Sequence, residues 1–217
     1  EGVARQWSSF NDYSGMQPTR FNAVWNIYYG EILVEVNSMI ADAQEDGYNH
    51  YVGIGQIQKA AALLDMTDWW GSIPYSTAAA GIEEVNPTFD TQESIYTEVF
   101  NLLASGSTLL AGSDGGFAVG SDDVIYGGDT SKWIKAASAI KARAHLHLGQ
   151  YADALAAAKA SFTSADDNMS YTFGATQQAG WWRFNDGRTG DIEFHPFLRA
   201  MMTDLNDTDR LAVWDQT

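Results

Sequence analysis

The sequence predicts an all-α fold of paired helices joined by long irregular loops, with little or no β structure. Apolar residues recur every three or four positions in five segments between residues 21 and 162, and Gly-, Ser- and Asp-rich stretches separate these segments. We find no convincing period-2 strand pattern. With 217 residues, 45% of them hydrophobic, the chain can bury a sizeable core. We therefore expect one helical domain over 1–217, with its helical core at 21–162 and a loop-rich segment at 163–217.

Two amphipathic helices open the predicted core. From Phe21 to Ala43 one apolar stripe at helical spacing consists of Trp25, Tyr28, Ile32, Val36, Met39 and Ala43. From Tyr51 to Met66 the corresponding stripe consists of Ile54, Ile57, Ala61 and Leu64. Gly47 supplies the break between the two helices.

Capping residues mark the next two helices. Asp90 with Glu93 three positions later has the capping-box layout, and it precedes a stripe of Ile95, Val99, Leu102, Leu103, Leu109 and Leu110. In GGDTSKW, Asp129 or Thr130 can accept the free N–H groups at the start of a helix. The apolar face of that helix consists of Trp133, Ala137, Ile140, Ala144 and Leu148.

Gly149 ends this helix, and helical spacing resumes at once through Tyr151, Ala154, Ala158 and Phe162. The stretch LHLGQYADALAAAKAS is similar to the second half of a tetratricopeptide repeat (TPR). We expect the two alanines to line the packing seam and the tyrosine to fill the hole at the turn. One such hairpin cannot bury its own face, so neighbouring helices must complete the core.

The charge and the cysteine content exclude several classes of function. Twelve Lys+Arg against 28 Asp+Glu give a formal net charge of -16, so the protein repels phosphate backbones, and nucleic acid is not an expected partner. The chain has no cysteine, which excludes thiolate nucleophiles and Cys-ligated metals. No apolar run reaches the length of a transmembrane helix.

Patterns for catalysis or metal binding are weak, and we expect no catalytic residue, no metal and no cofactor. Ser138 and Lys141 have S-x-x-K spacing but lie within a helix, and no K-T-G follows. Asp-rich loops such as Ser121 to Asp123 are common without a cation. Carboxylate pairs are so numerous that none stands out, so a helical glycoside hydrolase remains only a less favoured alternative.

Aromatic residues in polar segments are the candidate ligand contacts. QWSSFNDYSG and GWWRFNDGRTG place large rings beside Asn, Asp, Ser and Arg. A ring in this setting can stack on sugar C–H groups while its polar neighbours reach hydroxyls, or it can fold back as a lid on the helical core. The candidate contacts are Trp7, Phe10, Tyr13, Trp181, Trp182, Arg183 and Asn185.

Three motifs in order resemble the SusD/RagB family of surface nutrient-binding lipoproteins of Bacteroidota. They are DWWGSIPYSTA at 68–78, FD at 89–90 before a helix, and GDTSKW at 128–133 before a helix with A-x-x-x-K-A-R, and the resemblance runs across most of 21–158. It implies a TPR-like α/α superhelix. It also implies that aromatic, glycine and proline residues of these motifs are core and turn residues: Trp69, Trp70, Gly71, Pro74, Tyr75, Trp133, Gly149 and Tyr151.

The same resemblance implies a non-catalytic protein at the outer-membrane surface, attached by an N-terminal lipid that this chain does not carry. Its members bind glycans, or peptides in the RagB branch, and deliver them to a SusC-like TonB-dependent transporter. A peptide-binding protein or a TPR-type interaction scaffold is therefore the alternative. The family's D-P-R-L motif resembles Thr208 to Leu211, where Asp209 replaces the proline, and the family continues well beyond it. We accordingly expect a chain that is incomplete at both ends.

Overall fold

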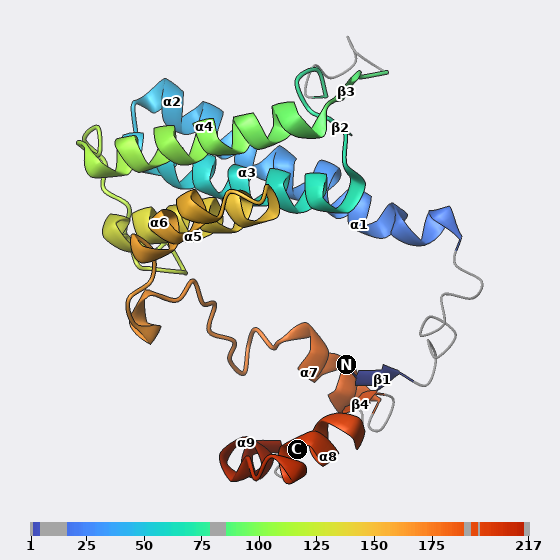
Figure 1. Cartoon of the computed structure of the whole chain (residues 1–217). Coiled ribbons are helices and arrows are strands. Elements are labelled where there is room, and N and C mark those ends of the chain that lie inside the picture. Colours follow the sequence, from blue (N-terminus) through green and yellow to red (C-terminus); the bar gives the residue numbers. More distant parts are fainter. Residues whose placement is uncertain (1, 5–16, 79–85, 189–191, 195, 215–217) are drawn as a thin grey trace. The chain divides into compact units, whose positions relative to one another are not determined.

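The computed structural model describes residues 2–4, 17–78, 86–188, 192–194 and 196–214, and its fold is all-α, as the sequence predicts (Figure 1). Contacts divide the chain into two compact units, one of residues 21–171 and one that combines 1–20 with 172–217. The helices of the larger unit are α1 (Asn22–Ile27), the π-helix η3 (Tyr28–Ile32), α2 (Leu33–Asp46), α3 (Asn49–Trp70), α4 (Gln92–Ala111), α5 (Thr130–His147), α6 (Tyr151–Lys159) and the short 3-10 helix η5 (Ala165–Asp167).

The first predicted helix contains a π-helical stretch that the sequence did not reveal. The 3-10 helix η2 (Pro18–Phe21), α1, η3 and α2 follow one another without a break. A π turn holds an extra residue, so it rotates the apolar stripe relative to a regular α-helix. Leu33 is accordingly 6% exposed, whereas the predicted Ile32 is only half-buried. Gly47 ends α2 with φ +78°, and Tyr48 N–H donates to Ala43 O at 2.8 Å, as in a Schellman motif.

Helix α3 is the centre of the core, because α2, α4 and α5 all pack against it (Figure 1). Ile57, Leu63 and Met66 of α3 are fully buried. Gly53 of α3 and Gly106 of α4 bring the two backbones into contact. A Cβ at Gly106 would lie 2.8 Å from Gly53 O and 3.1 Å from Ile57 Cγ1. These glycines set how closely the two helices approach.

Two of the sequence motifs meet in a small strand pair. Strand β2 (Ile73–Pro74) pairs antiparallel with β3 (Phe89–Asp90), with Ile73 opposite Asp90. The Asp90 carboxylate accepts bonds from Tyr75 N at 2.9 Å and from Ser76 N at 2.8 Å. The prediction of Asp90 as an N-cap was wrong, because Thr91 Oγ1 is the group that accepts from Ser94 N, at 3.2 Å.

The loop between α4 and α5 is organised around the carboxylate of Asp123. It accepts bonds from the backbone N–H groups of Ile125, Tyr126 and Gly128 and, at 2.8 Å, from the Trp133 indole N–H. Trp133 is 1% exposed. Asp129 caps α5 by accepting bonds from Ser131 N and Lys132 N, which agrees with the sequence prediction.

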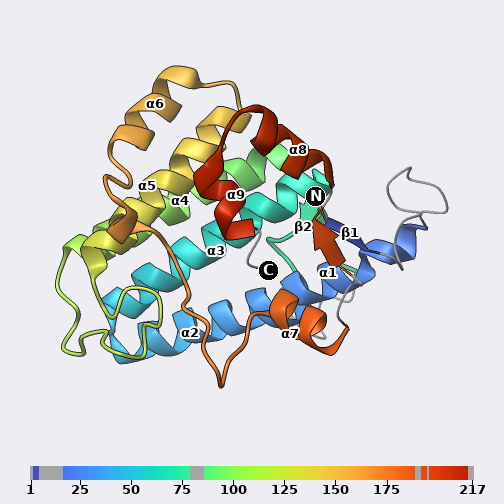
Figure 2. The ribbon, with the colours of Figure 1, turned by 90° about the horizontal axis from the view of Figure 1, so that it is seen from below.

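Helices α5 and α6 form the predicted hairpin around Gly149, which has φ +70° (Figure 2). Gln150 N–H donates to His145 O at 2.9 Å and Gly149 N–H donates to Leu146 O at 3.0 Å, which satisfies the last carbonyls of α5. The details of the seam differ from the prediction. Ala154 and Ala157 are buried, whereas Ala158 is exposed. Tyr151 is 72% exposed and fills no hole at the turn.

We expect Gly149→Val to lower the free energy of unfolding by about 1–3 kcal/mol, because a β-branched residue is strained at positive φ. No atom outside the turn lies within 4 Å of the new Cβ, so the loss would come from backbone strain alone. Chemical denaturation measures it. Gly30→Val is the control, because Gly30 is helical and equally open. Equal stability of the two variants would contradict the argument.

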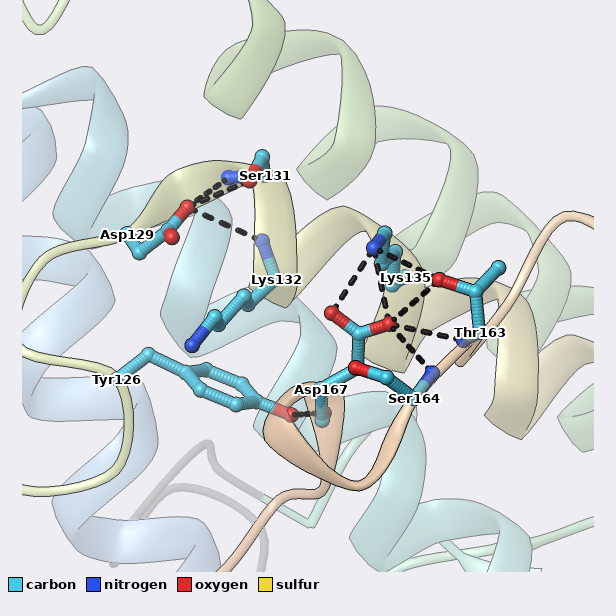
Figure 3. A network of polar contacts seen from close by, with 8 residues as sticks. All are labelled: Tyr126, Asp129, Ser131, Lys132, Lys135, Thr163, Ser164 and Asp167. Carbon is cyan, nitrogen blue, oxygen red and sulfur yellow. Dashed lines mark hydrogen bonds and ion pairs between the residues drawn. The ribbon is translucent and has the colours of Figure 1, made fainter.

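A polar network fastens the segment after α6 to α5 (Figure 3). The Lys135 ammonium contacts both carboxylate oxygens of Asp167, at 2.8 and 2.9 Å. Thr163 N–H donates to the same carboxylate at 2.8 Å, and Tyr126 Oη donates to Asp167 O at 2.8 Å. The hydrogen bond from Lys135, followed by those from Thr163, holds the pKa of Asp167 well below its usual range.

The smaller unit has its own strand pair and helices. Strand β1 (Gly2–Ala4) pairs antiparallel with β4 (Ile192–Phe194). The helices are α7 (Gly180–Gly187), α8 (Pro196–Asp204) and α9 (Thr208–Trp214), and α8 packs against α9. None of the helices in the described part of the chain combines the length and hydrophobicity needed to cross a membrane.

Candidate functional site: the α7 aromatic pocket

Four of the seven candidate contacts lie on a helix, whereas the sequence indicated a polar loop. Trp181, Trp182 and Arg183 belong to α7, and so does Asn185, whose side chain lies outside the described residues. The side chain of Trp181 is 71% exposed and that of Trp182 is 52% exposed. Successive helical residues are about 100° apart around the axis, so the two indoles face different directions. The other predicted contacts, Trp7, Phe10 and Tyr13, lie outside the described residues.

Trp182 lines an open pocket of about 330 Å³. The other lining residues come from the segment just before α7, and they are Phe173, Gly174, Ala175, Gln178 and Ala179. This segment is closed by a reciprocal pair of backbone hydrogen bonds, Gly174 N to Gln177 O at 3.1 Å and Gln177 N to Gly174 O at 3.2 Å. This part of the pocket lining therefore has a defined backbone turn.

The pocket combines aromatic surface with a small number of polar groups. Phe173 is 54% exposed, so the pocket offers a phenyl ring as well as the Trp182 indole. Gln178 contributes an amide that can both donate and accept. Exposed rings beside such groups suit a ligand that has C–H faces and hydroxyls. Phe173 and Gln178 were not among the predicted contacts, because neither lies in the aromatic stretch that contains Trp181 and Trp182.

The motif tryptophans of α3 differ in their surroundings. Trp70 is half-buried and contacts Trp25 edge-on, with ring centroids 5.0 Å apart, and Tyr28 at 6.0 Å. Trp69 is 57% exposed, and its ring centroid lies 5.7 Å from that of Trp70 and 6.5 Å from that of Tyr28. Gly71 ends α3 with φ +73°. Trp69 therefore lies on the surface, although the resemblance implies a core or turn residue.

A charged network joins α3 to α5 near these tryptophans. Arg143 contacts Asp65 at 2.8 Å, and His147 Nδ1 lies 2.9 Å from Asp68 Oδ2. Tyr96 Oη donates to Asp68 Oδ1 at 2.5 Å, and burial and this bond raise the pKa of Tyr96. Arg143, His147 and Tyr96 thus bring a cation, an imidazole and a hydroxyl to the carboxylates of Asp65 and Asp68 at the interface of these helices. In the described residues, no group of three or more His, Asp or Glu side chains could hold a metal ion.

Comparisons with known proteins place this fold in one family. The family model described as "Starch-binding associating with outer membrane" matches residues 3–217. No curated protein matches the chain at a significant level.

Thirty chains of solved structures match the fold. A SusD/RagB family protein from Bacteroides thetaiotaomicron is similar with a TM-score of 0.81 and 26% identity, over 95% of this chain and 45% of that chain. A chitin-binding protein is similar with a TM-score of 0.79 and 26% identity, over 97% of this chain and 46% of that chain. The chain thus spans less than half the length of these structures. The family match over almost the whole chain confirms the resemblance seen in the sequence, and the chain belongs to the SusD-like family.

Proposed function

We propose that this protein binds glycans without transforming them, and that the α7 aromatic pocket contacts the ligand. The observation that carries the proposal is the exposed Trp182 indole beside a 330 Å³ pocket that also holds Phe173 and Gln178. Ring faces of this kind stack on the apolar faces of sugars. The description of the family as starch-binding and the chitin-binding relative support a glycan as the ligand.

Membership of the family supports a location and a partner as part of the same proposal. The family is described as associating with the outer membrane. We place the protein at the cell surface, attached by an N-terminal lipid, where it passes glycans to a SusC-like TonB-dependent transporter. Copurification of such a transporter with the protein from native outer membranes tests this part. Isolation without any transporter under mild detergent would contradict it.

Trp182→Ala is expected to weaken glycan binding about tenfold and to leave the unfolding midpoint nearly unchanged, because a half-exposed ring contributes more to a ligand than to the core. Calorimetric titration with starch- and chitin-derived oligosaccharides measures the affinity. Trp69→Ala is the matched control, since Trp69 is 57% exposed but lies in the larger unit and does not line this pocket.

Three results would overturn the proposal. Equal glycan affinities of the Trp182→Ala and Trp69→Ala variants would show that the α7 pocket does not contact the glycan. Binding to peptides with no binding to any glycan would favour the peptide-binding alternative. Release of reducing sugar during incubation with the oligosaccharides would show an enzyme.

A further inference from the structure

A second pocket, of about 310 Å³, lies in the larger unit between η3, α2, α3 and the turn after α3. Its walls are largely apolar, formed by side chains such as Leu33 and Pro74 and by the tyrosines Tyr29 and Tyr75. Three further polar side chains line it, Asn37, Lys59 and Ser76, and the Ser76 hydroxyl donates to Asp90 Oδ1 at 2.8 Å. The pocket therefore sets one cation and one amide among largely apolar walls.

Hydrogen bonds to neighbouring groups fix the tyrosine walls. Tyr29 Oη donates to Pro74 O at 2.7 Å, and Tyr75 Oη donates to Glu98 Oε1 at 2.9 Å. The Asp90 carboxylate holds the backbone N–H groups of Tyr75 and Ser76. Both phenol hydroxyls thus donate to protein oxygens. The ammonium of Lys59 and the amide of Asn37 are the donors that remain for a ligand among the described lining residues.

Lys59 is half-buried, and its ammonium lies 5.1 Å from the centroid of the Tyr75 ring. No carboxylate of a described residue forms an ion pair with it. Burial lowers the pKa of Lys59, and the charge of Glu98 offsets this only in part. A desolvated ammonium without an ion-pair partner gains more from an incoming anion than a solvated one does.

We propose that this second pocket binds a uronic acid residue of a glycan, with Lys59 as the counter-ion of its carboxylate, and that the protein therefore prefers glycans that contain uronic acid. The inference rests on the glycan-binding function proposed above. The tyrosine faces and apolar walls suit the ring of a sugar, and the ammonium and the Asn37 amide suit its carboxylate. Two carboxylates lie next to the pocket, but Glu98 accepts a bond from Tyr75 Oη and Asp90 accepts bonds from Tyr75 N and Ser76 N, and neither lines the pocket. Lys59 is the charged residue among the described lining residues, and charges farther away are screened beyond about 8 Å at physiological salt.

Calorimetric titration with an oligogalacturonate and with its carboxyl-reduced counterpart tests the proposal, because the two ligands differ only in the charged group. The unmodified protein is expected to bind the acid about tenfold more tightly than the reduced form. Lys59→Met removes the charge and nearly preserves the side-chain shape, and it is expected to abolish the preference while the reduced ligand binds as before. Lys59→Arg, which keeps the charge, is expected to retain most of the preference.

Lys141→Met is the matched control, because Lys141 is an exposed lysine of α5 outside both pockets. It should leave the preference intact, and thermal unfolding checks that every variant is folded. A preference that survives Lys59→Met, or none in the unmodified protein, overturns the inference. If Trp182-dependent binding of neutral glycans persists in that case, the proposed function stands. If neither oligosaccharide nor any other glycan binds, both fail. Lys59-dependent binding of peptide carboxylates alone would overturn the assignment to a sugar.

Discussion

Trp133→Ala is expected to lower the free energy of unfolding by about 3–5 kcal/mol, the range typical of a large ring removed from a core. Trp133 is 1% exposed, and its ring meets Tyr126 edge-on with centroids 5.3 Å apart. The substitution also removes the indole N–H that donates to Asp123, the carboxylate that organises the loop before α5. Urea denaturation followed by circular dichroism measures the loss.

Trp133→Phe separates the two contributions. The phenyl ring retains most of the buried surface but cannot donate to Asp123, so we expect a smaller loss of roughly 1–2 kcal/mol. Trp69→Ala provides the reference for a tryptophan that is 57% exposed. If Trp133→Ala and Trp69→Ala destabilise the protein equally, burial of Trp133 does not explain its role.

Gly106→Val is expected to lower the free energy of unfolding by about 3 kcal/mol, because α4 could accommodate the valine side chain only by moving away from α3. The first added carbon would lie 2.8 Å from the carbonyl oxygen of Gly53. That oxygen belongs to the backbone of a buried helix, so it cannot rotate aside as a flexible side chain would. The unfolding midpoint in urea is the appropriate measurement.

Ala104→Val is the control for helix propensity, since Ala104 is exposed on the same helix. Valine is less favourable than alanine in a helix by only a few tenths of a kcal/mol to about 0.7 kcal/mol. If Gly106→Val lowers the free energy of unfolding no more than Ala104→Val does, then α3 and α4 can move apart without cost, contrary to the close contact at Gly53.

The helices were predictable because the buried side of a helix requires an apolar residue every three or four positions, and this repeat is visible in the local sequence. Ile95, Val99 and Leu103 of α4 and Trp133, Ala137 and Ala144 of α5 lie in the core as their spacing indicates. The cap of α4 was not predictable in the same way. Asp90 and Thr91 are both good capping residues, and Asp90 is taken by the backbone of Tyr75 and Ser76, fourteen or fifteen positions away in the sequence.

The candidate sites depend still more on contacts between distant residues. The exposed tryptophans stand out by their polar neighbours, but no local pattern indicates that Phe173 and Gln178 share a pocket with Trp182. Lys59 is the charged residue of the stretch IQKAAALL, which is apolar apart from Gln58 and Lys59, and that is its only local signal. Its proximity to Tyr75 arises because the chain turns back at Gly71.

The pairing of Ile73–Pro74 with Phe89–Asp90 has a consequence for how such proteins diversify. The pairing holds together the two ends of the segment that connects the strands. The entropic cost of closing such a connection grows only slowly with its length. Insertions and deletions between the two strands would therefore leave the neighbouring helices in register. Apart from Tyr75 and Ser76, which line the second pocket and are held by Asp90, the length of this connection can change while the inherited helical frame stays the same.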